Sequence, residues 1–380
     1  IVFTKQLSLT AYLNSYNNNI VEFYSSNSPT LAKECIVNFK GYDFLITPIA
    51  GKFRFNFKEI VSRLINLNNF EDSVDPYILL GSEESLVYDN TANTYMNDAV
   101  TFTVGFFGTG TVDSVVVNYK WLKSVEQIED QKKGMIRGEN QLAILSPFKA
   151  GTNNSYNITY AEGYPFDISI LTEATGTLDV KNLTTDHDVN FNINTRVNRL
   201  FFCDGRTNIT ISDYLPLVDG INVLEINDDD GNTVYVYLNK ISIRKGEYIK
   251  WQNQSGGWSY NLFNCVHKRE RKIKDLKTVN NDFYDLQNTV SPFLNLGKTS
   301  VDTLTLISDL IDDHGQDVLN DLLDSPKVYY YAGVQYSQDT SDVWVAINPK
   351  ITKSNVVNYK KRYITYKLNF ELPQRNTMTL

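Results

Sequence analysis

Residues 222–238 read NVLEINDDDGNTVYVYL, and this stretch decides the fold class. Two runs of alternating apolar residues flank the segment Asp228–Asn232, DDDGN. Asp-Gly between two such runs is a strong signal for a β-hairpin with a tight turn. Calcium binding is the alternative interpretation, since carboxylate and Asn oxygens suit that ion. An EF-hand loop also needs a Glu six residues after its Gly, however, and Tyr237 stands there. The hairpin is therefore the preferred interpretation.

Short runs of β-branched and aromatic residues recur around this hairpin, about 8 to 12 residues apart, with Gly, Asn and Asp between them. Such spacing favours a β-sandwich or barrel over a parallel α/β sheet. The runs expected to form strands are Asp167–Leu171, Gly176–Val180, Val189–Ile193, Arg199–Phe202, Asn208–Ile211, Asn222–Ile226 and Thr233–Leu238.

The first third of the chain has the same character. Lys52–Phe57, KFRFNF, alternates Phe with polar residues, which predicts a half-buried strand. The apolar spacing over Phe57–Leu67 predicts one short helix. Ala99–Phe107 and Ser114–Trp121, with Gly108-Thr109-Gly110 in their connection, predict a hairpin.

The last third adds strands and a helical insert. In Ser300–Asp324, SVDTLTLISDLIDDHGQDVLNDLLD, the apolar spacing predicts two short helices with a break at His314-Gly315. Tyr363–Leu372, YITYKLNFEL, alternates like a strand. The charged segment Lys123–Asn140 is interpreted as a linker or surface loop.

These patterns together predict a mainly β fold of sandwich-like modules with a small helical insert around residues 300–324. The expected modules are 1–125, which holds the short helix, 126–245 and 246–380. A chain of 380 residues is long enough for two or three domains.

Charge and composition limit the classes of partner. The net charge is −8 and the pI is about 5.1, which argues against a general nucleic-acid binder or a protein of anionic membranes. No apolar run approaches the length of a membrane span, and no signal peptide is visible at the start. Cys35, Cys203 and Cys265 lie too far apart to indicate a disulfide framework or a zinc site, and we expect buried free thiols.

The sequence offers little to catalysis. The three histidines, His187, His267 and His314, have no histidine partner at metal-ligand spacing. No phosphate-binding loop and no GxSxG motif occurs. We therefore expect no enzymatic activity, cofactor or metal. The basic run His267–Lys277, HKRERKIKDLK, is interpreted as a solvated face or a subunit contact rather than a nucleic-acid site.

The most unusual block is Trp251–Phe263, WQNQSGGWSYNLF. We expect a hairpin with a turn at Gln254–Gly257, where glycines supply positive φ. Core packing, an aromatic subunit interface and a sugar-stacking site remain as alternatives for this block. The candidate interface or stacking residues are Trp251, Trp258, Tyr260 and Phe263.

The pattern W-x-N-x-x-G-G-W-x-x-x-x-F in this block, the segment LPLVDGINVLEI (Leu215–Ile226) and the ending YITYKLNFELP resemble tail and baseplate-type structural proteins of tailed phages that infect Bacteroidetes, crAss-like phages among them. The resemblance covers mainly the last 170 or so residues. It implies a non-enzymatic virion protein of the tail, baseplate or head-to-tail connector, assembled in the host cytoplasm. Copies of the chain and other virion proteins would be its partners. A module that binds a host surface glycan is the alternative.

Overall fold

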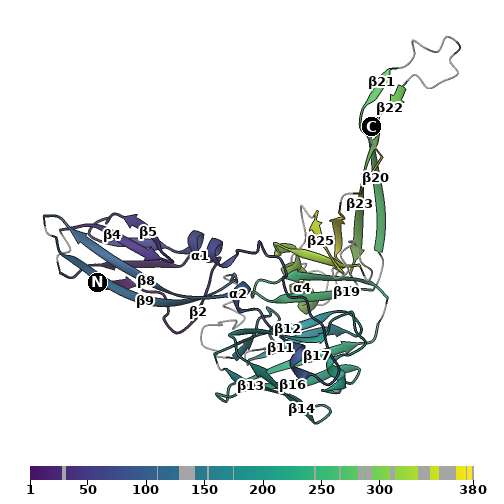
Figure 1. The fold of residues 1–380 in the computed structure, drawn as a ribbon, viewed down its shortest axis with the longest axis horizontal. Helices are drawn as coiled ribbons and strands as arrows, with labels where there is room; N and C mark the ends of the chain where they lie inside the picture. The colour runs from purple at the N-terminus through teal and green to yellow at the C-terminus, as the bar shows by residue number, and fades with distance from the viewer. Residues whose placement is uncertain are drawn as a thin grey trace. The chain divides into compact units, whose positions relative to one another are not determined.

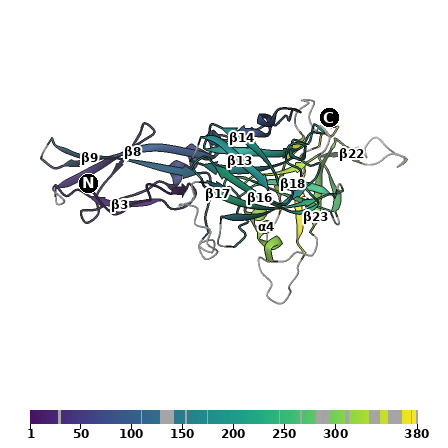
Figure 2. The same cartoon turned by 90° about the horizontal axis from the view of Figure 1, so that it is seen from below.

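The structure is a computed structural model. It describes residues 1–27, 31–108, 110–127, 142–151, 154–173, 175–243, 245–264, 267–280, 287, 293–308, 313–332, 343–350, 365–373 and 375–378. The fold is mainly β, as predicted, with several sheets and few helices in this part of the chain (Figures 1 and 2). Two compact units are present. The first comprises Ile1–Ser242 and Asn253–Ser259, and the second comprises Ile243–Gln252 and Tyr260–Leu380.

The first unit begins with a sandwich of two sheets. Its three-stranded sheet has the order β1 (Val2–Lys5), β3 (Ile20–Tyr24), β6 (Phe53–Asn56). Its five-stranded sheet has the order β2 (Tyr12–Asn14), β9 (Val112–Leu122), β8 (Tyr95–Phe106), β4 (Ala32–Phe39), β5 (Tyr42–Ile46). The short helix α1 (Lys58–Ile65) follows β6, as the sequence predicts.

Aromatic side chains fill the core of this sandwich. Phe23 of one sheet lies 5.0 Å, between ring centroids, from Phe102 of the other, and 5.4 Å from Phe53. The alternation of KFRFNF explains this placement, because Phe53, Phe55 and Phe57 are buried while Arg54 and Asn56 are exposed. The predicted β8–β9 hairpin is also confirmed, with Val100 opposite Val117.

A second sandwich completes the first unit. Its four-stranded sheet has the order β10 (Leu142–Ile144), β12 (Phe166–Thr172), β15 (Val197–Cys203), β7 (Val87–Asp89). Its five-stranded sheet has the order β11 (Ser155–Ala161), β17 (Thr233–Ile241), β16 (Gly220–Asp228), β13 (Gly176–Asn182), β14 (His187–Ile193). The hairpin predicted at Asp228–Asn232 joins β16 to β17. Figure 2 shows these two strands in one sheet with β13 and β14, and β16 is the neighbour of β13.

Three short helical segments accompany these strands: η1 (Glu83–Leu86), α2 (Thr91–Thr94) and η2 (Ile211–Asp213). The strand predicted over Asn208–Ile211 is wrong, because Thr210 and Asp213 form a capping box that starts η2 instead. Strand β11, which the sequence did not predict, pairs in parallel with β17.

The second unit is built on a seven-stranded sheet with the order β19 (Trp258–Phe263), β18 (Glu247–Gln252), β24 (Val328–Tyr331), β25 (Trp344–Pro349), β26 (Lys367–Glu371), β23 (Lys298–Ile307), β20 (His267–Asp275). Helix α4 (Asp313–Asp324) contacts this sheet, since Trp251 Nε1 donates a hydrogen bond to Asp321 Oδ2 at 2.6 Å. Strands β20 and β23 continue into the pair β21 (Thr278–Asn280) and β22 (Phe293–Asn295), as Figure 1 shows.

The predicted helical insert is half wrong. The second of its two helices is α4, but the break predicted at His314-Gly315 is wrong, because both residues lie in the first turn of α4. Residues 300–307 are strand, because Leu304 and Leu306 alternate with Thr303 and Thr305 and both leucines are buried in the sheet. Most of the ending YITYKLNFEL behaves as predicted: Tyr366, Leu368, Phe370 and Leu372 are buried, whereas Ile364 lies outside the described residues.

The linker or loop predicted over Lys123–Asn140 is described only as far as Gln127. Its first residue is no surface residue: Lys123 is buried, and its Nζ donates to Asn68 Oδ1 at 2.7 Å. In the part of the chain that the structure describes, no helix is both long and apolar enough to cross a membrane.

Candidate functional site

The aromatic block forms the predicted hairpin of β18 and β19, whose tip belongs to the first unit. Its turn is organised by one side chain, Asn253. The side-chain oxygen of Asn253 accepts hydrogen bonds from the backbone N–H groups of Ser255 and Gly257, at 2.9 and 3.0 Å. Its side-chain nitrogen donates to Leu145 O and Ser259 Oγ, both at 3.0 Å. The Asn of the sequence pattern is therefore a buried turn organiser.

The two glycines of the block are required for close approach. Gly256 has φ +93°, in the left-handed region that favours glycine, and a Cβ there would lie 2.8 Å from Lys123 O. A Cβ on Gly257 would lie 2.3 Å from the carbonyl oxygen of Leu145. Any larger residue at Gly257 would push the turn away from the end of β10.

Trp258 packs beside a buried ion network. The guanidinium carbon of Arg199 lies 5.9 Å from the ring centroid of Trp258. Arg199 donates to Asp167 through two nitrogens, at 2.7 and 2.9 Å, and to Asp72 at 2.6 Å. All three charged side chains are at least 96% buried, so Trp258 and the network form part of the interior of the first unit.

The candidate interface residues therefore have unequal access to a partner. Trp251, Trp258 and Phe263 are buried in this chain, at 0%, 7% and 3% exposure. Tyr260 is partly exposed, and its ring stacks on Tyr248 with centroids 5.9 Å apart. The structure brings the four residues onto one hairpin, and their role as an interface or stacking surface remains a prediction.

A more accessible feature is a long antiparallel ribbon, residues 267–280 paired with residues 293–306. Strand β26 also pairs with Thr303–Ile307 at its base, and the ribbon is two-stranded beyond that point. The register is continuous from His267 opposite Leu306 to Asn280 opposite Phe293, with backbone hydrogen bonds at Leu276 and Leu296 joining the two halves. At about 3.3 Å per residue, fourteen paired residues extend roughly 45 Å. Every residue from 267 to 280 is exposed. The predicted solvated face of HKRERKIKDLK is thus an edge strand of the sheet.

The ribbon is basic although the chain is acidic. It contains seven Lys or Arg and three Asp or Glu, so its net charge is +4, and since the whole chain carries −8, the remainder carries −12. The two faces of the ribbon differ. On one face, Arg271 forms an ion pair with Asp302 at 2.8 Å, and Lys298 lies 3.7 Å from Asp275.

The other face, which we call the lysine face, holds Lys268, Lys272, Lys274, Leu276 and, on the opposite strand, Phe293, because alternate residues of a strand share a face. Glu270 lies on the same face and forms an ion pair with Lys268 at 2.6 Å, so the net charge of these side chains is positive and Lys272 and Lys274 carry it. Among the described residues, neither Lys272 nor Lys274 has an ion pair with a carboxylate. Leu276 and Phe293 are 48% and 57% exposed. Sequence reasoning found the charges of this face but missed its apolar end.

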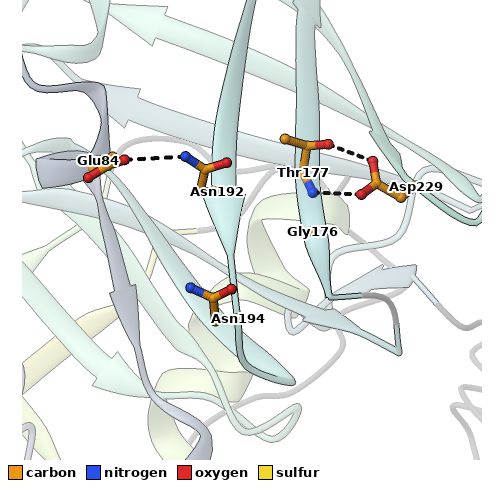
Figure 3. Close-up of a pocket in the computed structure, with 6 residues that line it drawn as sticks. All are labelled: Glu84, Gly176, Thr177, Asn192, Asn194 and Asp229. Atoms are coloured by element: carbon orange, nitrogen blue, oxygen red, sulfur yellow. Dashed lines mark hydrogen bonds between the residues drawn. The ribbon is translucent and has the colours of Figure 1, made fainter.

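An open pocket of about 480 Å³ lies at one end of β13 and β14, lined by Glu84, Gly176, Thr177, Asn192, Asn194 and Asp229. Figure 3 shows Asp229 facing Thr177, whose backbone N–H and hydroxyl donate to it at 2.8 and 2.6 Å. These bonds hold the pKa of Asp229 below its ordinary value. Asn192 donates to Glu84 at 3.2 Å. The lining is polar, with amide and carboxylate groups on several elements.

The groups considered for chemistry are scattered. His187 Nδ1 lies 2.8 Å from Thr185 O, and His267 Nε2 lies 3.5 Å from Glu247 Oε1. The side chain of His314 is outside the described part of the chain. Cys35 and Cys203 are buried, and burial raises their pKa to about 12 and about 11, while Cys265 is outside the described residues. No group of three or more His, Cys, Asp or Glu within the described ranges could hold a metal ion.

Comparison with known proteins places the chain in no family. No protein-family model matches it, and no curated protein matches it. One similar solved structure is a protein of unknown function from Porphyromonas gingivalis W83, with 8% sequence identity and a TM-score of 0.15. The match covers 63% of this chain and 95% of that one. A likeness this weak carries no argument about fold or function.

Proposed function

We propose that this chain is a structural subunit of a phage virion, in the tail, the baseplate or the head-to-tail connector. It assembles with copies of itself into a symmetric oligomer and contacts other virion proteins. The exposed ribbon is the observation that carries the proposal. A two-stranded ribbon is marginally stable in water by itself. Beyond its base this ribbon has two strands, and every side chain of β20 is exposed, which is best explained by contact with another molecule.

The resemblance of the Trp251–Phe263 block to phage tail proteins gives the proposal its biological setting. The buried Asn253 and Gly257 explain that sequence pattern as a turn held against β10, which is a requirement of the fold. In this setting the chain needs no catalytic activity. Its work is mechanical, and the free energy comes from apolar area buried at contacts that symmetry repeats.

The solution mass of the purified protein, measured by light scattering, tests self-assembly, and negative-stain images of the same peak test its symmetry. We expect a defined multimer, either a closed ring or a short tube. A monomer at every concentration up to about 100 µM, where standard-sized interfaces are saturated, would contradict a homo-oligomeric subunit.

Immunogold labelling tests the location in the virion. Antibodies raised against the purified chain are applied to intact particles and to the cell lysate that yields them. Gold on one defined part of the particle is expected, and it would name that part. Gold confined to soluble lysate proteins, with unlabelled particles, would rule out a virion component.

Glycan binding is a second candidate, and the polar pocket favours it. Amide and carboxylate groups such as those of Asn192, Asn194 and Asp229 suit the hydroxyls of a sugar. A glycan array with the wild type and Asn192→Ala tests it, with exposed Asn208→Ala as the control. A signal lost only in Asn192→Ala would move this function to first place.

A further inference from the structure

We propose that the lysine face of the ribbon docks on the outward face of the β11-β17-β16-β13-β14 sheet of a second copy of this chain. The proposal rests on the proposed function, because it requires copies to assemble, and it names the two surfaces that meet. No described residue of the chain covers either surface, and their net charges are opposite.

The outward face of this sheet is defined by alternation. Leu178, Val180, Leu224, Ile226 and Val236 point into the sandwich and are buried, so the residues between them point outward. Its acidic side chains come from three adjacent strands: Asp188 on β14, Asp179 on β13 and Glu225 on β16. We call this surface the acidic face.

Its charges are not balanced locally. Lys181 is the one cation among the outward-facing described residues of β13, β14 and β16. Its Nζ lies 3.0 Å from Asp186 in the adjoining turn, and this ion pair raises the pKa of Lys181 and lowers that of Asp186. With Asp179, Asp186, Asp188 and Glu225 against Lys181, this surface has a net charge of −3.

The spacing of charges on the two surfaces is similar. Lys272 and Lys274 are two residues apart on one strand, which separates them by about 6.6 Å. Asp188 stands opposite Lys181, so Asp188 and Asp179 are diagonal neighbours, about 7 to 8 Å apart. One lysine can therefore reach each carboxylate when the ribbon lies across the strands.

Apolar groups on the two surfaces complete the match. Beyond its lysines, the ribbon presents Leu276 and Phe293. Beyond its carboxylates, the sheet presents Tyr237 on β17 and Ile221 on β16, which are 38% and 64% exposed. The paired charges would fix the register, and the apolar contact would supply most of the affinity.

The chain's own surfaces argue for a partner of this composition. All of β20 is exposed, so the described part of the same chain leaves the ribbon accessible. Outside the ribbon the chain carries −12, which makes another copy an attractive partner for a basic ribbon. A contact between two different surfaces is heterologous, and repetition of such a contact closes a ring or extends a tube.

Charge reversal tests the contact. The ribbon variant is Lys272→Glu with Lys274→Glu, and the sheet variant is Asp179→Lys with Asp188→Lys. In a solution of either variant by itself, the two docking surfaces carry charges of the same sign. We expect the self-association of each variant, measured by sedimentation velocity, to weaken roughly 10-fold or more. A 1:1 mixture opposes unlike charges at both contacts and should recover the wild-type mass. Raising the salt to about 0.5 M should weaken the wild-type assembly.

The control variant is Lys5→Glu with Lys58→Glu. It makes the same change in net charge as the ribbon variant, at two exposed lysines of the first sandwich. It should assemble like the wild type. Thermal melts confirm that every variant is folded. Wild-type assembly by the ribbon variant would overturn the docking while leaving the proposed function intact. Two dissociated variants that fail to recover when mixed would show that the ribbon binds another surface. A monomeric wild type would overturn the docking and also the self-assembly in the proposed function, whereas immunogold labelling decides the virion location separately.

Discussion

The side-chain amide of Asn253 donates a hydrogen bond to the carbonyl oxygen of Leu145 at 3.0 Å, across 108 residues of chain. This bond joins the tip of the aromatic hairpin to the end of β10, inside the first unit. It gives the sequence pattern around Gly256-Gly257 a structural meaning, because each of its polar or small residues meets a specific backbone group.

Gly257→Ala should destabilise the protein. The added Cβ would lie 2.3 Å from Leu145 O and 3.1 Å from Ser169 Cβ, so the turn or β10 must move. Overpacking of this kind costs roughly 1–3 kcal/mol. Chemical denaturation measures it, with Gly110→Ala as the control, since a Cβ at Gly110 meets nothing within 4 Å. Equal midpoints for the two variants would refute the close approach.

Asn253→Ala should cost about 2–4 kcal/mol, because it removes the partner of two backbone N–H groups and of Leu145 O in a buried turn. Asn208, which is exposed, provides the control. The same denaturation experiment applies. A loss no larger than that of Asn208→Ala would mean that water replaces these hydrogen bonds at little cost.

Arg199→Met should be severely destabilising, by about 3–5 kcal/mol, because it removes the guanidinium that Asp72 and Asp167 both contact in the interior. The matched control is Arg54→Met. Arg54 also contacts a carboxylate, that of Glu22 at 2.6 Å, but it is 69% exposed, and its loss should cost less than about 1 kcal/mol. Similar unfolding midpoints for the two variants would contradict the importance of burial here.

Hydrogen exchange should distinguish the ribbon from the rest of the fold. In dilute monomer the amides of β20 should exchange quickly, because the strand has no buried side chains. The amides of β16, whose alternate side chains are buried, should exchange slowly. Concentration to the point of assembly should slow the amides of β20. Protection of β20 in the monomer would show that the ribbon is already covered.

Sequence reasoning succeeded where local pattern and tertiary packing agree. Alternation placed Phe53 and Phe55 in the core, and the Asp-Gly turn paired β16 with β17. It failed at Ser300–Ile307, where the spacing of Leu304 and Ile307 also fits a helix. Pairing with β20 and β26 decides for the strand, and that pairing is a tertiary effect.

The candidate surfaces were only partly predictable. The charges of His267–Lys277 are plain in the sequence, but the apolar partner Phe293 joins them through a register that no local signal specifies. The aromatic block attracted attention through its tryptophans, whereas the structure buries Trp251 and Trp258. Composition alone does not say whether an aromatic residue fills a core or meets a partner.

Lys123 should make stability depend on pH. Burial lowers its pKa from 10.5 to about 8, with Nζ 4.9 Å from the ring centroid of Phe70. Below pH 8 both the folded and unfolded states hold the proton, and the folded state bears the cost of a buried charge. Above pH 8 the folded state releases the proton while the unfolded state keeps it until about 10.5, so this contribution to stability rises with pH.

The measurement is the free energy of unfolding between pH 7 and 9, for the wild type and for Lys123→Met. The pH range ends at 9 because of Cys35. Burial raises the pKa of its thiol above the ordinary value of 9.0, so above pH 9 the unfolded state loses this proton first and stability falls with pH. The stability of the wild type should rise relative to that of Lys123→Met as the pH passes 8. Parallel curves would show that Lys123 keeps an ordinary pKa and that water reaches its ammonium group.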